Sequence, residues 1–154
     1  MSLIPVNHPM RPVFRTLGGI AGLFLAITGV IGLVRSWGGG VFARDAVWVF
    51  GLRFNPASAT VFLLLGAVVV IGTLIGGQVE HVTNLTVGVM VLGIGFVALA
   101  LLRFANFLNY SMTNVIVSFI LGLLLVTVGM YDKVGPPVRV HASHRSGQGQ
   151  PTRP

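Results

Sequence analysis

The chain contains no cysteine and very few acidic residues, since three Asp and Glu stand against ten Lys and Arg. The lack of cysteine excludes disulfides, thiolate metal sites and cysteine nucleophiles. Charged residues make up only 8% of the 154 residues, whereas an ordinary soluble domain carries about 25%. Because 54% of the residues are hydrophobic and the mean hydropathy is +0.90, a single core of this length cannot hide the apolar surface from water. The composition therefore predicts an integral membrane protein with one domain.

Four stretches contain no charged residue and approach the length of about 20 residues that spans a bilayer. They cover 16–34, 57–75, 82–102 and 112–131. All eight prolines lie outside these stretches, which favours helices because proline disrupts a helix interior. We therefore predict an all-α membrane protein of four antiparallel transmembrane helices over 16–131. An N-terminal flank over 1–15 precedes them, and a disordered basic tail over 132–154 follows them.

The connection over 35–55 is the longest between two predicted helices and holds both tryptophans and several phenylalanines. Aromatic side chains favour the membrane–water boundary. We therefore expect this loop to lie on the bilayer surface as a short amphipathic segment or a hairpin. At its end, Asn55 followed by Pro56 is typical of a helix N-cap with proline at the first helical position. Gly76 and Gly77 are typical of a helix end.

The basic residues predict the orientation of the chain in the membrane, because cytoplasmic flanks of membrane helices carry an excess of Lys and Arg. With four helices both termini share one side, and that side carries the larger number of basic residues. These are Arg11, Arg15, Lys133, Arg139, Arg145 and Arg153, against Arg35, Arg44, Arg53 and Arg103 on the other side. We expect a multi-pass protein of the cell membrane with both termini in the cytoplasm. The positive charge is thus assigned to helix flanks, and no nucleic-acid partner is predicted.

Small residues recur at a spacing of about four in two of the predicted helices. They are Gly18, Gly22, Ala26 and Gly29 in the first, and Gly72 and Gly76 in the second. A row of small side chains lets two helix backbones approach closely and gain van der Waals contact that lipid does not supply. Two interpretations stay open, namely packing within the same bundle and self-association of two copies.

Polar side chains near the predicted helix ends are the remaining candidates for a site. They are Glu80, His81, Asn84, Arg103, Asn106, Asn109 and Asn114. Glu80 and His81 are expected at a solvated helix end, where an acid is favoured by the positive end of the helix dipole. Asn84 and Thr86 are expected to form hydrogen bonds between helices, each worth about 0.6 kcal/mol.

Arg103 begins the most polar stripe of the sequence and has two interpretations. In one, Arg103 supplies the charge of a site for an anion or a lipid headgroup. In the other, Arg103 extends to the membrane surface while the asparagines that follow it cap the turn. The second interpretation is favoured because long basic side chains near helix ends commonly reach for water in this way.

Motifs for catalysis, cofactors and metals are missing from the sequence. It contains no HExxH, phosphate-binding loop, GxSxG or glycine-rich dinucleotide turn, and no charged residue within the predicted spans. We therefore assign no catalytic residue, no cofactor and no metal ligand, and we do not expect an enzyme. A lipid-modifying activity of Glu80 and His81 is the only enzymatic alternative.

Several short motifs resemble a known family. They are Val49-Phe50-Gly51-Leu52-Arg53-Phe54-Asn55-Pro56 with Leu63-Leu64-Leu65-Gly66, and 109–114 with Ile120-Leu121-Gly122 and Gly129. Across most of 14–133 the chain is similar to the actinobacterial family called domain of unknown function 4383. The resemblance implies a small four-helix protein of the bacterial plasma membrane and carries no assigned activity. Members often have histidines early in helices two and four, whereas 57–61 and 114–118 contain none here.

These observations favour a non-enzymatic subunit, scaffold or accessory protein of a membrane complex in the cell envelope. Its expected partners are membrane lipid and other membrane proteins or a second copy of itself. The alternative is a small oligomeric transporter or channel, in which Asn84, Thr86, Asn114 and Ser118 would converge on a shared axis.

Overall fold

The computed structural model describes residues 10–45, 47–133 and 135. Its elements are α1 (Arg11–Ser36), β1 (Val47–Val49), β2 (Leu52–Phe54), α2 (Pro56–Ile75), α3 (Gly77–Leu101) and α4 (Met112–Tyr131). The predicted helical class is confirmed, because all four helices are long and apolar enough to cross a membrane. Most of the predicted flank (1–9) and tail (134 and 136–154) lies outside the described residues.

The ends of the helices agree with the sequence in two cases and differ in two. The bounds of α2 and α4 lie within one residue of those expected, but α1 begins at Arg11 instead of residue 16, and α3 at Gly77 instead of 82. Both helices extend past their apolar runs. In α1, proline occupies the first turn, where its missing N–H costs nothing. The extra turns carry Arg15 and Glu80, which pair with each other.

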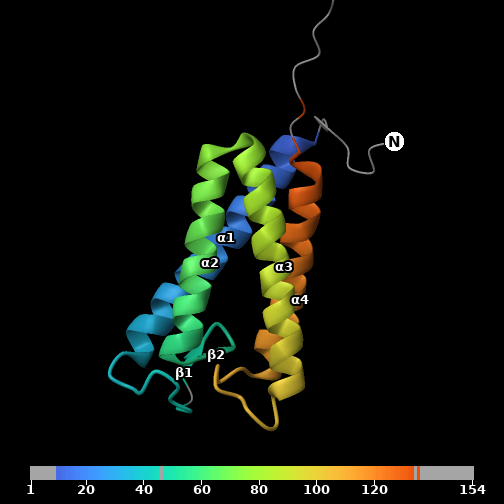
Figure 1. Cartoon of the computed structure of the whole chain (residues 1–154). Coiled ribbons are helices and arrows are strands. Elements are labelled where there is room, and N and C mark those ends of the chain that lie inside the picture. The colour runs from blue at the N-terminus through green and yellow to red at the C-terminus, as the bar shows by residue number, and fades with distance from the viewer. Residues whose placement is uncertain (1–9, 46, 134, 136–154) are drawn as a thin grey trace, which may run out of the picture.

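The helices form two closely packed pairs, the α1–α2 pair and the α3–α4 pair. α1 packs mainly against α2 and α3 mainly against α4, with less contact between the pairs. The start of α1, the junction of α2 with α3 and the end of α4 lie at one end of the bundle (Figure 1). We call this the terminal end. The strands and the α3–α4 link lie at the other, the hairpin end (Figure 1).

Glycine sets the close approach within each pair. A Cβ added at Gly29 of α1 would lie 2.4 Å from the backbone nitrogen of Leu63 in α2. One added at Gly66 of α2 would lie 2.3 Å from the backbone nitrogen of Ala26 in α1. In the other pair, Gly129 of α4 would place a Cβ 2.7 Å from a backbone nitrogen of α3. Backbones this close leave no room for any side chain, which is the packing typical of membrane helices.

The small residues singled out in the sequence lie at contacts within the chain. A Cβ at Gly22 would meet the side chain of α2 residue Val69 at 2.6 Å, and one at Gly18 would meet an α4 valine at 3.0 Å. Gly72 would meet Thr83 of α3 at 2.8 Å. Gly76 has another role, because it joins α2 to α3 with a φ of +75°, in the left-handed region that favours glycine.

The loop before α2 contains a β-hairpin, one of the two forms expected for it. β1 and β2 pair antiparallel, with Val47 opposite Phe54. The two turn residues, Phe50 and Gly51, both have positive φ, as a two-residue turn of type I′ requires. Arg35 at the end of α1 donates from Nη1 to the carbonyl of Trp48 at 2.9 Å, which ties the hairpin to α1.

Substitution of Gly29 by alanine is expected to lower the free energy of unfolding by ~1–3 kcal/mol, because the added methyl group meets backbone rather than a movable side chain. Gly93→Ala is the matched control, since Gly93 is exposed in α3 and a Cβ there meets nothing within 4 Å. The control is expected to stabilise the helix by roughly 0.5–1 kcal/mol. Thermal unfolding in mild detergent compares the two, and equal melting temperatures would contradict the packing described.

Candidate functional site

At the hairpin end, Asn55 caps the start of α2 and forms a hydrogen bond with the link between α3 and α4. Its Oδ1 accepts from the backbone N–H of Ser58 at 2.8 Å, and its own N–H donates to the Ser58 hydroxyl at 3.0 Å. The predicted N-cap is thus confirmed, as a full capping box. The remaining amide group, Nδ2, donates to the carbonyl of Phe107 in the α3–α4 link at 2.7 Å. One side chain therefore caps α2 and fixes the other helix pair.

Asn114 in the first turn of α4 makes the reciprocal connection. Its Oδ1 accepts from the backbone N–H of Arg53 in β2, and its Nδ2 donates to the Arg53 carbonyl, both at 2.9 Å. The same Oδ1 accepts from the Ser111 hydroxyl at 2.7 Å. Asn114 is fully buried, and it extends β2 by one pair of backbone-like hydrogen bonds.

Two further asparagines complete this end. Asn109 has a positive φ of 54°, and its Nδ2 donates to the carbonyl of Asp45 at 2.8 Å. Asn106 accepts from the N–H of Tyr110 at 2.8 Å and donates to its carbonyl at 2.7 Å. Asn106 therefore caps its own turn, as predicted for the asparagines after Arg103, whereas Asn109 bonds the segment around the hairpin instead. We call Asn55, Asn106, Asn109 and Asn114 the asparagine clasp.

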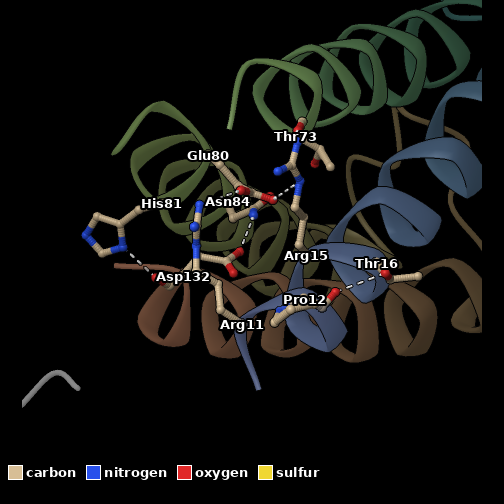
Figure 2. Close-up of polar contacts among 10 residues, drawn as sticks. Arg11, Pro12, Arg15, Thr16, Thr73, Glu80, His81, Asn84 and Asp132 are labelled. Carbon is tan, nitrogen blue, oxygen red and sulfur yellow. Dashed lines mark hydrogen bonds and ion pairs between the residues drawn. The ribbon is translucent and has the colours of Figure 1, made fainter. Parts of the chain in front are cut away.

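At the terminal end, charged side chains of α1 meet a buried acid of α3. Glu80 has no exposed surface. Its Oε2 lies 3.6 Å from Nη2 of Arg11, and its Oε1 lies 3.7 Å from Nε of Arg15 (Figure 2). Arg15 also donates from Nη2 to the carbonyl of Thr73 at 2.7 Å, in the last turn of α2. A cation is favoured there because the carbonyl ends of a helix are negative.

Asp132 joins α3 to the end of α4 at the same place. Asn84 donates from Nδ2 to Oδ2 of Asp132 at 3.2 Å, so the interhelical hydrogen bond predicted for Asn84 is present. His81 donates from Nδ1 to the carbonyl of Gly129 in α4. Burial raises the pKa of Asp132 above its ordinary value, while the Asn84 hydrogen bond and the nearby arginines act in the opposite direction. Arg11, Arg15, Glu80, Asn84 and Asp132 are called the terminal cluster.

The expectation of a solvated helix end at Glu80 and His81 is wrong. Glu80 is 0% exposed and His81 is 7% exposed. The reason is the early start of α1, whose first turns carry two arginines onto Glu80. One signal of this burial was present in the spacing, since Glu80 and Asn84 are four apart and therefore share a helix face.

The two clusters join the helix pairs at the two ends of the bundle. Among the described residues no three His, Asp or Glu side chains are placed to hold a metal ion. A cavity near the middle of the bundle, next to Tyr110 and Ser118, measures about 10 Å³ and admits one water molecule at most. Of the candidates, Arg103 is exposed, and its side chain forms no hydrogen bond or ion pair with either cluster. Thr86 is exposed as well.

Comparisons of the chain with protein-family models, with curated proteins and with solved structures found no match. The assignment of the chain to a family, including the resemblance described above, therefore stays a prediction.

Replacement of Asn114 by alanine is expected to lower the free energy of unfolding by about 2 kcal/mol or more, because both backbone groups of Arg53 lose their partner. Thr127→Ala serves as the control. Thr127 is exposed on the same helix, and its hydroxyl bonds only the Leu123 carbonyl one turn earlier. Denaturation in mild detergent measures both variants. If N114A lowers the free energy of unfolding no more than T127A does, the asparagine clasp contributes little to stability.

Asp132→Asn is expected to stabilise the protein increasingly as pH rises. Because the pKa of Asp132 is raised in the folded chain, the folded state holds this proton more tightly than the unfolded state does. The stability that the group contributes is present below its ordinary pKa of 3.8 and is lost as pH rises through the raised value. Melting temperatures between pH 4 and 8 test this, with the exposed Asp45→Asn as the charge-matched control. A difference between D132N and the unmodified chain that stays constant with pH would contradict the assignment.

Proposed function

We propose that this chain crosses the cell membrane with four antiparallel helices and serves as a non-enzymatic subunit, scaffold or accessory protein of a cell-envelope membrane complex. One observation carries this proposal. Most buried polar side chains form hydrogen bonds or ion pairs within the chain, mainly with backbone groups, while the outward helix faces are apolar. A protein with this distribution offers its surroundings surfaces for packing and few groups for chemistry.

The exposed faces fit lipid and helix partners. Large apolar side chains stand outward on every helix, among them Val34 at 70%, Leu74 at 75% and Phe96 at 63% exposure. In water such surfaces would associate or aggregate, because soluble proteins rarely expose contiguous apolar patches of this extent. In a bilayer they are satisfied by acyl chains or by the helices of a neighbouring protein.

The alternative of an oligomeric transporter or channel is less well supported. It needs Asn84, Asn114 and Ser118 on a face shared between copies, but these residues are 0%, 0% and 1% exposed. The amides of both asparagines are engaged within the chain. Of the four polar positions considered for a pore, Thr86 alone is exposed.

The proposal includes a bacterial plasma membrane and both termini in the cytoplasm, together with membership in the domain of unknown function 4383 family. The plasma membrane and the family are supported by the motifs around Asn55 and 109–114. The orientation is supported by the larger number of basic residues in the two terminal segments.

The mass of the intact particle tests the proposed function. The tagged chain is purified from its native membrane in mild detergent and weighed by native mass spectrometry. We expect other membrane proteins at a fixed ratio to this chain, retained after washing at increasing salt. An unrelated tagged four-helix membrane protein, purified in parallel, controls for contaminants. A particle made of this chain alone would reject the subunit function, and its copy number would decide whether a pore between copies is possible.

A further inference from the structure

A basic pocket lies at the hairpin end, between the segment around the β-hairpin and the link that follows α3. Its volume is about 170 Å³. Three arginines line it, Arg44, Arg53 and Arg103, together with Asn106 and Asn109 of the asparagine clasp. These arginines come from three separate places in the sequence, and the fold brings them to one opening.

The positive charge of this pocket has no counterpart in its walls. The chain has only three acidic residues, and two of them, Glu80 and Asp132, belong to the terminal cluster at the opposite end. The third, Asp45, is exposed and forms no ion pair with an arginine within 10–45, 47–133 and 135. Since guanidinium groups stay charged at every physiological pH, three of them around one opening repel each other unless an anion lies between them.

The arginine side chains of the pocket have N–H donors that bond nothing in the described part of the chain, whereas its asparagine side chains are engaged. The side chains of Arg44 and Arg103 form no hydrogen bond or ion pair with the described part of the chain, and both residues are exposed. Arg53 donates from Nη2 to the carbonyl of Arg44 at 3.1 Å, while its buried Nε has no partner among the described residues. Asn106 and Asn109 are engaged with backbone groups and hold the walls in place.

We infer that this pocket binds a phosphate group. Guanidinium groups present paired N–H donors that match phosphate oxygens, and phosphate carries the charge that the three arginines lack. The surroundings favour a phospholipid as the carrier of the phosphate. Phe104, next to Arg103, is 87% exposed, and α3 ends only three residues earlier, at Leu101. A lipid would place its phosphate among the arginines and its acyl chains along the apolar helix faces beside Phe104.

The lipid source depends on the membrane insertion proposed above, but the phosphate site itself does not. Two ligands therefore test it on the purified particle. Phosphatidylglycerol in mixed micelles is titrated and its binding followed by native mass spectrometry, with diacylglycerol of the same chains as the phosphate-free lipid. Inorganic phosphate is titrated separately against chloride at equal ionic strength, with the melting temperature as readout.

Variants locate the binding. Arg103→Gln removes a side chain with no bond in the described fold, and Arg44→Gln with Arg103→Gln removes two. Arg35→Gln is the charge-matched control, because Arg35 lies at the same end but does not line the pocket. Since this change also removes the bond to the Trp48 carbonyl, the melting temperature of R35Q is measured first, and the variant is compared where it is folded. We expect R103Q to weaken phosphatidylglycerol binding roughly fivefold, because each basic residue near an anionic lipid surface raises the affinity by about that factor. The double variant should weaken binding further. R35Q should bind as the unmodified chain does.

Each outcome decides the inference. Saturable binding of phosphatidylglycerol that R103Q weakens and R35Q does not would support a lipid source. Stabilisation by inorganic phosphate with the same dependence on Arg103, without binding of the lipid, would support the site with a free phosphate. Equal binding by R103Q and R35Q, or diacylglycerol bound as tightly as phosphatidylglycerol, would overturn it. None of these outcomes depends on whether the particle contains partner proteins.

Discussion

The structure depends on polar side chains that join two helix pairs at both ends of the bundle. Glycine lets α1 approach α2, and α3 approach α4, until backbone meets backbone, but contact between the pairs is smaller. At one end Asn55 donates to the α3–α4 link and Asn114 bonds the backbone of β2, and at the other end Arg11 and Arg15 meet Glu80. In a low-dielectric interior, an amide or carboxylate that loses its partner costs more than a lost packing contact does. These few groups therefore fix how the two pairs lie together.

The use of asparagine at the hairpin end follows from the same constraint. A helix that starts next to lipid must satisfy its first N–H groups without water, and a capping side chain does so within the chain. The amide oxygens of Asn55 and Asn114 accept hydrogen bonds at or near the start of their own helices. Their amide nitrogens donate to backbone carbonyls of the other helix pair. Aspartate would cap equally well but has no donor when ionised, and serine would have to accept and donate through one short hydroxyl. The amide thus combines two tasks that would otherwise need two residues.

The four helices were predicted from the sequence because each contains an apolar run of about 20 residues, long enough to cross a membrane. The starts of α1 and α3 were missed, since these turns carry Arg11, Arg15 and Glu80, and polar residues interrupt a hydropathy pattern even where the helix continues. The burial of Glu80 was also missed, because its partners lie in another helix far away in the sequence. The caps at Asn55 and Gly76 were predicted because their chemistry is local. The hydrogen bond from Asn55 to the carbonyl of Phe107 was not predicted, because no local pattern encodes a contact between two loops.

The charges at the two ends of the bundle differ in a way that bears on orientation. In the terminal cluster two arginines face two acids, so their formal charges cancel, whereas Arg44, Arg53 and Arg103 at the hairpin end have no such partners. In the folded state the hairpin end is thus the more positive of the two described ends. This does not reverse the orientation we propose. The excess of Lys and Arg acts while the helices insert, before distant residues pair, and acidic residues contribute little to it. With both termini in the cytoplasm, the arginine pocket faces the outer leaflet, where the phosphate it needs comes from lipid rather than from the cytoplasm.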